Sequence, residues 1–165
     1  MAKAVHIIER IQTVIGLSFL TLFFGVLLYQ IITRHLGISV IWTEELASYS
    51  FVWSVFMGAA VMVNRKEHFS FDMLVKKLKG KSLLVLLTVN DIILLVFNSA
   101  LFVYGLQVVR EFWNNEWIAL SFMKMGYVWI AIPLMAGTMI IYTLHHLINR
   151  FQKVSKQGVE SWESS

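Results

Sequence analysis

The chain has 165 residues, of which 58% are hydrophobic and only 15% are charged, and its formal net charge is +4. A soluble domain of this size does not have such a composition, so a soluble enzyme is excluded. Cysteine is absent, which excludes disulfides, thiolate metal ligands and cysteine nucleophiles.

Four apolar runs are long enough to cross the hydrocarbon core of a bilayer, which takes about 20 helical residues. They predict membrane spans at about 11–33, 44–64, 82–109 and 125–148. The first run is longer than the apolar core of a signal peptide, so we expect it to be retained. Because the bilayer core offers no water to backbone groups, each span should be α-helical. The predicted fold is an all-α membrane protein with four transmembrane helices in a single domain, 1–165.

Adjacent carboxylates stand where the second span begins. Glu44 and Glu45 follow Thr43, whose hydroxyl suits a helix N-cap, and the helix dipole stabilises acidic side chains in a first turn. One glutamate could also pair with Arg34 at the end of the first helix. A paired-carboxylate acid/base site is the alternative, but nothing nearby supplies a substrate pocket.

The second span has a stripe of small residues. Ser50, Ser54 and Gly58 recur every four residues, and Ala59 and Ala60 widen the stripe toward the inner end. Small side chains let another membrane helix approach closely. The stripe therefore predicts a packing or assembly surface.

The second connection is basic and amphipathic. Its apolar residues recur at i, i+3, i+4 and i+7 from Phe71, while lysines occupy other angles. This pattern predicts a short helix over 68–79 on the cytoplasmic membrane surface. We assign its polar residues to the membrane interface: His68, Asp72, Lys76, Lys77 and Lys79.

Asp91 lies inside the third span, about 14 Å along the helix axis from its start. An ionised carboxylate at that depth costs several kcal/mol unless it is paired or hydrated. It could be an ion or proton site, or it could make a hydrogen bond between helices or subunits. We favour the structural role, because the sequence places no Lys, Arg or His at a similar depth in any predicted span.

The third connection mixes aromatic and polar residues, among them Trp113, Trp117 and Glu116. Such aromatic rings prefer the headgroup layer, so we assign the two tryptophans to the outer membrane interface, in a surface segment or an irregular loop. Pro133 predicts a bend in the last span. Residues 151–165 predict a frayed polar tail.

Lysine and arginine set the orientation, because they stay on the cytoplasmic side of short loops. The two tails and the second connection together hold 11 of the 14, and the other two connections hold three. Both termini should therefore be cytoplasmic. The net positive charge follows from this topology, so nucleic-acid binding is not indicated.

The histidines are poorly placed for haem. His6, His68, His145 and His146 fall near the inner boundary and His35 near the outer one, so no two spans offer a matched pair at mid-depth. We expect no cofactor and no metal. Beside a partner subunit, two other functions stay open: a small homo-oligomeric transporter or channel, and a membrane anchor of a respiratory enzyme.

One series of residues is specific in its order. It consists of Arg34, then Trp42-Thr43-Glu44-Glu45-Leu46-Ala47, then Trp53, Gly58-Ala59-Ala60, His68 and Asp72. This order resembles the small, DctQ-like membrane subunit of tripartite ATP-independent periplasmic (TRAP) transporters. The other spans match that family mainly in hydropathy. Arg65-Lys66-Glu67 is a departure, because the family often has a glycine-containing turn there.

The resemblance implies a subunit without catalytic activity. In that family a much larger membrane subunit holds the sodium and substrate sites, and a periplasmic protein transiently delivers an organic acid such as a dicarboxylate or sialic acid. This chain would be the scaffold partner in a heterodimer of the bacterial inner membrane. We assign to the assembly interface Arg34, Trp42, Glu44, Glu45, Ser50, Ser54, Gly58 and Asp91.

Overall fold

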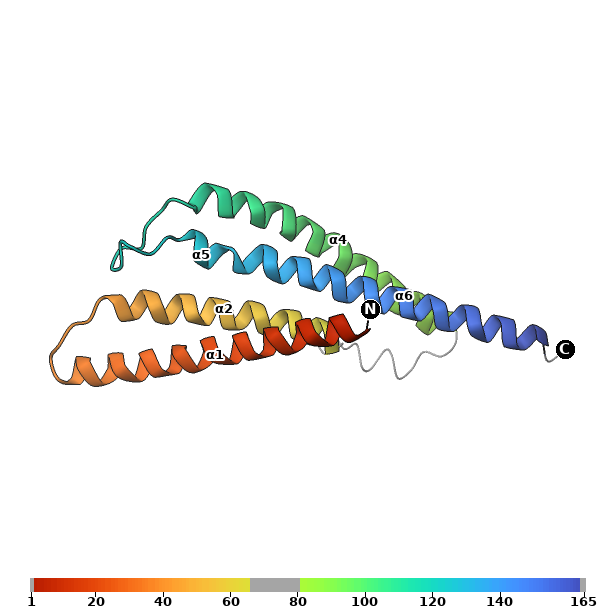
Figure 1. Cartoon of the computed structure of the whole chain (residues 1–165), viewed down its shortest axis with the longest axis horizontal. Helices are drawn as coiled ribbons and strands as arrows, with labels where there is room; N and C mark the ends of the chain where they lie inside the picture. The colour runs from red at the N-terminus through yellow and green to blue at the C-terminus, as the bar shows by residue number, and fades with distance from the viewer. Residues whose placement is uncertain (1, 66–80, 164–165) are drawn as a thin grey trace.

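The structure, a computed structural model, describes residues 2–65 and 81–163 (Figure 1). Its helices are α1 (Ala2–His35), α2 (Trp42–Arg65), α4 (Lys81–Phe112), α5 (Gly126–Trp129) and α6 (Ala131–Glu163). Four spans, the last formed by α5 with most of α6, are long and apolar enough to cross a membrane, which confirms the predicted fold class. The predicted amphipathic helix 68–79, with its five interface residues, lies outside the described residues.

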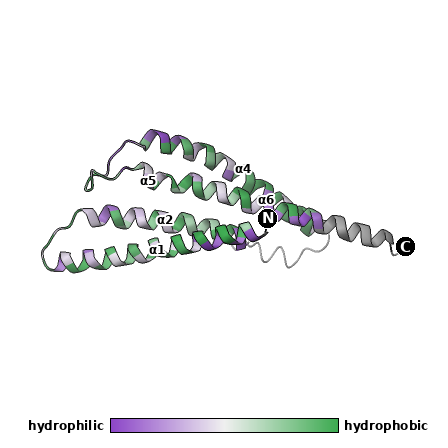
Figure 2. Cartoon of the chain, in the orientation of Figure 1, coloured by the Kyte–Doolittle hydropathy of each residue, from purple (hydrophilic) through white to green (hydrophobic). Residues whose placement is uncertain are grey.

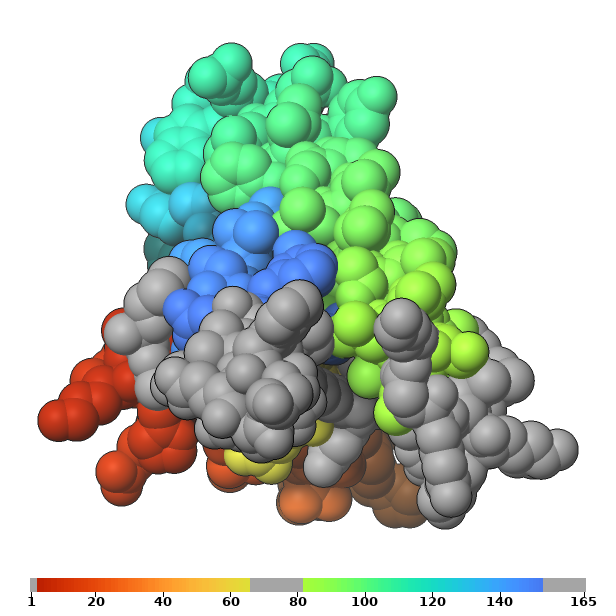
Figure 3. Space-filling view, turned by 90° about the vertical axis from the view of Figure 1, so that its right-hand side faces the viewer, coloured from red at the N-terminus to blue at the C-terminus, as the bar shows by residue number. Residues whose placement is uncertain are grey.

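The helices form two antiparallel hairpins. α1 packs along α2, α4 packs along α6, and contacts between α2 and α6 join the hairpins. We call the end that carries the chain termini inner and the opposite end outer, following the predicted orientation. Seen from the inner end, α6 lies between α4 and the α1–α2 hairpin (Figure 3).

Little of the apolar surface is buried within the chain. Hydrophobic residues cover most of each span, and hydrophilic ones concentrate near the helix ends (Figure 2). In the most apolar window of α4 only 11% of residues are buried, against 44% in the span formed by α5 and α6. α6 is therefore the central helix, and most faces of the others are left for lipid or a partner.

Glycines on α1 and α4 let the neighbouring helices approach closely. A Cβ built on Gly105 of α4 would lie 2.9 Å from Ile132 Cγ2 and 3.3 Å from the Pro133 backbone nitrogen. On α1, a Cβ on Gly16 would lie 3.2 Å from Met57 Cβ of α2. Pro133 follows the break between α5 and α6, as expected for a residue that cannot donate to the carbonyl four residues before it.

The connection between α1 and α2 begins with a glycine cap. Gly37 has φ +75°, and the Ile38 amide donates to the Thr33 carbonyl at 2.9 Å. This left-handed residue and the bond across it end α1 as a Schellman motif does. The turn brings the last turn of α1, which contains Arg34, and the first turn of α2 to the same end of the molecule (Figure 1).

Candidate functional site

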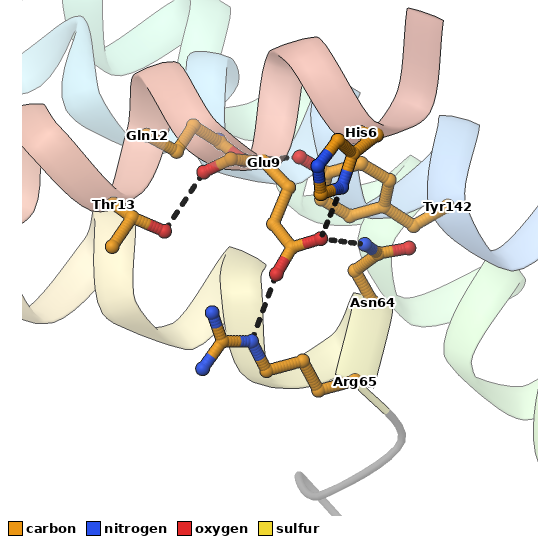
Figure 4. A network of polar contacts seen from close by, with 7 residues as sticks. All are labelled: His6, Glu9, Gln12, Thr13, Asn64, Arg65 and Tyr142. Atoms are coloured by element: carbon orange, nitrogen blue, oxygen red, sulfur yellow. Dashed lines mark hydrogen bonds and ion pairs between the residues drawn. The ribbon is translucent and has the colours of Figure 1, made fainter. Parts of the chain in front are cut away.

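A polar network at the inner end joins α1 to α2 (Figure 4). Glu9 Oε2 accepts a hydrogen bond from Asn64 Nδ2 at 2.8 Å, and Glu9 Oε1 lies 2.8 Å from Arg65 Nε. The Glu9 side chain is 14% exposed and that of Arg65 is 50% exposed. The pair thus lies near the inner end of both helices, with the carboxylate turned toward protein.

The neighbouring turn of α1 joins α6. The Gln12 amide donates to Thr138 Oγ1 at 2.8 Å, and the Tyr142 hydroxyl donates to Gln12 Oε1 at 2.5 Å. Gln12 and Tyr142 are buried. Sequence reasoning missed this contact, although a glutamine inside an apolar span was a usable signal, because a buried amide needs partners in the bundle.

Asp91 forms an ion pair with Arg150 of α6. Asp91 Oδ2 lies 2.7 Å from Arg150 Nη1, and both side chains are almost buried. The expectation that no cation lies at the depth of Asp91 was therefore wrong. It failed because α6 continues beyond residue 148, which places Arg150 in a helix beside α4. Seven residues further along α4, buried Asn98 donates to the Leu94 carbonyl at 2.8 Å.

At the outer end, Glu45 binds the third connection. Its Oε1 accepts from the Ile118 amide at 2.8 Å and its Oε2 accepts from the Ala119 amide at 3.0 Å. Nearby, Trp53 Nε1 donates to the Tyr127 carbonyl at 3.1 Å. These bonds hold the outer end of α2 to the α4–α6 hairpin.

The third connection is an irregular loop, which was the alternative to a regular surface segment. The Trp117 amide donates to the Met123 carbonyl at 3.0 Å, and the Met125 amide donates to the Asn115 carbonyl at 2.7 Å. Trp117 is 5% exposed and packs on Tyr49, with ring centroids 4.5 Å apart. Its ring therefore faces protein.

Trp113 keeps a partly exposed ring, packed edge-on against Tyr127 with ring centroids 5.9 Å apart. Trp42, at the start of α2, stacks on Tyr29 of α1 with centroids 5.9 Å apart. Both indoles lie at the outer end, and a place among the lipid headgroups stays a prediction for them.

Glu44 and Arg34 do not pair as expected. Gln30 Nε2 donates to Glu44 Oε1 at 3.4 Å, and within the described residues Arg34 forms no ion pair with either glutamate. Gln30, Arg34 and Glu44 all line a pocket of about 270 Å³ under the α1–α2 turn. Thr43 is not the N-cap, because α2 already begins at Trp42; its hydroxyl donates to the Val40 carbonyl at 2.6 Å.

The small residues of α2 have three different environments. Ser50 is buried and Ser54 is partly buried, whereas a Cβ built on Gly58 would meet nothing within 4 Å. Ser54 and Gly58 border an apolar groove of about 210 Å³ between α1 and α2, into whose lining Gly16 also enters. Within this chain the stripe is thus only partly used for packing.

The chemistry of these groups is structural. Among residues 2–65 and 81–163, no group of three or more His, Asp and Glu side chains could hold a metal ion. Glu9, Glu45 and Asp91 each meet donors of the same chain. The arrangement can fix helices and a loop, and it offers no pair of free carboxylates for proton transfer in this part of the chain.

Comparison with known proteins places these features in a family. Residues 23–153 match the family model described as tripartite ATP-independent periplasmic transporters, DctQ component. A Haemophilus influenzae protein named as a TRAP transporter small permease protein is 26% identical over 85% of this chain and 86% of its own length. The sialic acid TRAP transporter small permease protein SiaQ of Vibrio cholerae is 28% identical over 87% of this chain and 83% of its own length.

A third relative is a much longer protein. The sialic acid TRAP transporter permease protein SiaT of Haemophilus influenzae is 33% identical over 75 residues. These residues are 45% of this chain and 12% of that protein. A segment similar to part of this chain therefore lies within a larger permease polypeptide.

Proposed function

Because this chain belongs to the DctQ component family, the small permease subunits of TRAP transporters, we propose that it is the scaffold partner of a large, sodium-coupled membrane subunit in the uptake of an organic acid. It is a transporter subunit and no enzyme. The substrate would be a carboxylate, such as a dicarboxylate or sialic acid, delivered by a periplasmic binding protein to a complex in the bacterial inner membrane.

One observation carries the scaffold role. The carboxylates Glu9, Glu45 and Asp91 are each bound by donors of their own chain. A carboxylate that couples transport to an ion must exchange that ion during the cycle, which an internal ion pair opposes. The long relative SiaT adds support, because there a similar segment is joined covalently to a larger permease.

Reconstitution tests this role. We expect the purified chain alone to give no uptake of any organic acid in liposomes, and uptake to appear only when the large subunit and the binding protein are added with a sodium gradient. The physical reason is that the described spans hold no free ionisable group at mid-depth. Uptake by the chain alone would favour the small homo-oligomeric transporter instead.

The groove beside Gly58 is our proposed assembly surface. Gly58 leaves room for close approach of another helix, and the groove is lined almost entirely by apolar surface. It lies between α1 and α2. Arg34, Trp42 and Glu44 remain proposed contributors along the same hairpin, whereas buried Ser50 would contribute only through packing inside this chain. Glu45 and Asp91 would act indirectly, by stabilising the fold that carries this groove.

Leucine at Gly58 should block assembly without unfolding the subunit. A Cβ at this position meets nothing within 4 Å, and the rest of the leucine side chain would occupy the groove, so we expect about tenfold less large subunit to co-purify with Gly58→Leu. Ser54→Leu should act in the same direction. The measurement is the ratio of the two subunits after affinity purification through this chain.

Gly25→Leu is the matched control, because a Cβ on Gly25 also meets nothing within 4 Å but borders a different groove on α1. It should keep the wild-type ratio of subunits. Loss of the large subunit from Gly25→Leu, with Gly58→Leu unaffected, would place the partner on the other groove and contradict this assignment.

A further inference from the structure

The tip of the third connection exposes two large apolar side chains. Ile118 is 90% exposed and Phe122 is 78% exposed, more than any other large hydrophobic residue in the described part of the chain. Between them, only Ser121 has a polar side chain. Left in water, such a tip would be unfavourable, so something apolar should cover it.

The tip is held in place. Both oxygens of Glu45 accept hydrogen bonds from the amides of Ile118 and Ala119, and Trp117 is packed against Tyr49. The loop is also closed on itself by the bond from the Met125 amide to the Asn115 carbonyl. Ile118 is therefore exposed on a loop whose position is fixed by these contacts.

The depth of the tip is that of the outer membrane interface. Glu45 lies in the first turn of α2, next to Trp42, and its carboxylate reaches the tip directly. Figure 1 shows the connection between α4 and α5 beside the outer end of α2, without reaching past the turn between α1 and α2. Trp42 and Trp113, both partly exposed, mark the layer where aromatic side chains meet lipid headgroups.

We propose that Ile118 and Phe122 insert into the outer leaflet of the bilayer and form a non-helical lipid anchor, which Glu45 positions. Lipid fits this surface better than a protein partner. An aromatic side chain buries about 150–250 Å², so Phe122 and the smaller Ile118 together fall well short of the roughly 1,200 Å² of a stable protein interface. This inference does not depend on the proposed partner.

Spin labels can test the anchor, and the absence of native cysteine makes single-cysteine variants clean. The full-length chain carries a nitroxide at Ile118→Cys or Phe122→Cys in bilayers of phosphatidylethanolamine and phosphatidylglycerol. Collisions with oxygen, which concentrates in lipid, are compared with collisions with a water-soluble nickel chelate. Ile93→Cys, on an exposed face of α4, gives the lipid reference, and Asn114→Cys, in the same loop, gives the water reference.

We expect the ratio of oxygen to nickel collisions at Ile118 and Phe122 to exceed that at Asn114 several-fold. A ratio equal to that of Asn114 would place the tip in water and overturn the proposal. Exclusion of both probes, in the chain alone or with a large subunit present, would mean that protein covers the tip and would overturn it equally.

The positioning role of Glu45 has its own test. In Glu45→Ala the label at Ile118 should become more mobile, and its ratio should fall toward that of Asn114, because the two amide bonds are lost. Glu44→Ala is the control, because this neighbouring carboxylate accepts a hydrogen bond from Gln30 and not from the loop amides described above. It should leave the ratio of oxygen to nickel collisions at Ile118 unchanged. An unchanged ratio in Glu45→Ala would contradict the positioning role.

Discussion

Asp91→Arg is expected to lower the free energy of unfolding of this subunit by about 3 kcal/mol or more, which is the usual cost of removing one partner of a buried ion pair. The substitution places a second guanidinium where Asp91 Oδ2 now lies 2.7 Å from Arg150 Nη1, and both native side chains are almost buried. Thermal unfolding of the detergent-solubilised chain, followed by the loss of its monodisperse peak, measures the effect.

Reversal of both charges distinguishes the ion pair from a general intolerance of arginine. The double variant Asp91→Arg, Arg150→Asp should recover a large part of the lost stability, because the attraction between α4 and α6 returns with its sign exchanged. Arg110→Asp changes a charge on the exposed surface of α4 and should cost little. A double variant no more stable than Asp91→Arg would refute the pairing.

The same contact determines what to expect of Asp91→Asn. An amide keeps a hydrogen bond, but it leaves the Arg150 guanidinium without this counter-charge. We therefore expect Asp91→Asn to destabilise the subunit less than Asp91→Arg does, with uptake by the complex falling only as far as stability falls. Uptake lost from a fully stable complex would instead assign Asp91 a role in ion coupling.

The spans could be predicted because hydropathy alone decides which segments enter a bilayer. Helix length could not be predicted in the same way. The fourth apolar run ends near 148, yet α6 continues to Glu163, because polar residues outside the hydrocarbon do not stop a helix. That difference hid Arg150 as the partner of Asp91.

Hydrogen bonds from side chains to distant backbone groups could not be predicted from the sequence either. Glu45 was interpreted through its place in the first turn of a helix, where a carboxylate is stabilised by the helix dipole. Its partners are the amides of Ile118 and Ala119, more than 70 positions away. Every residue except proline has such a donor, so no pattern of side chains distinguishes these two.

The small residues in the sequence show where another helix can approach closely. They do not show at which of these positions a helix contact forms. The stripe at Ser50, Ser54 and Gly58 was visible in the sequence, whereas the tight contacts of glycines inside this chain are at Gly16, Gly105, Gly126 and Gly137. A glycine permits close approach only if a neighbour arrives at its level, and that depends on the register of both helices. The register is set by the whole bundle.

Gly105→Leu is therefore expected to have the second large effect. The new Cβ alone would lie 2.9 Å from Ile132 Cγ2, 3.2 Å from Pro133 Cδ and 3.3 Å from the Pro133 nitrogen. The proline ring and the backbone cannot rotate away, so α4 must move off α6. Overpacking of this kind costs about 1–3 kcal/mol, and we expect the upper end here.

Thermal unfolding of Gly105→Leu, Gly58→Leu and Gly25→Leu in detergent separates the clash from the general effect of leucine in place of a helical glycine. Only Gly105→Leu should lose stability, because a Cβ at Gly58 or Gly25 meets nothing within 4 Å. Equal unfolding temperatures for all three variants would show that α4 and α6 do not meet at this level. The Asp91–Arg150 pair would then hold α4 on α6 without the contact at Gly105. In that case Asp91→Arg should lower the free energy of unfolding by more than the value expected above.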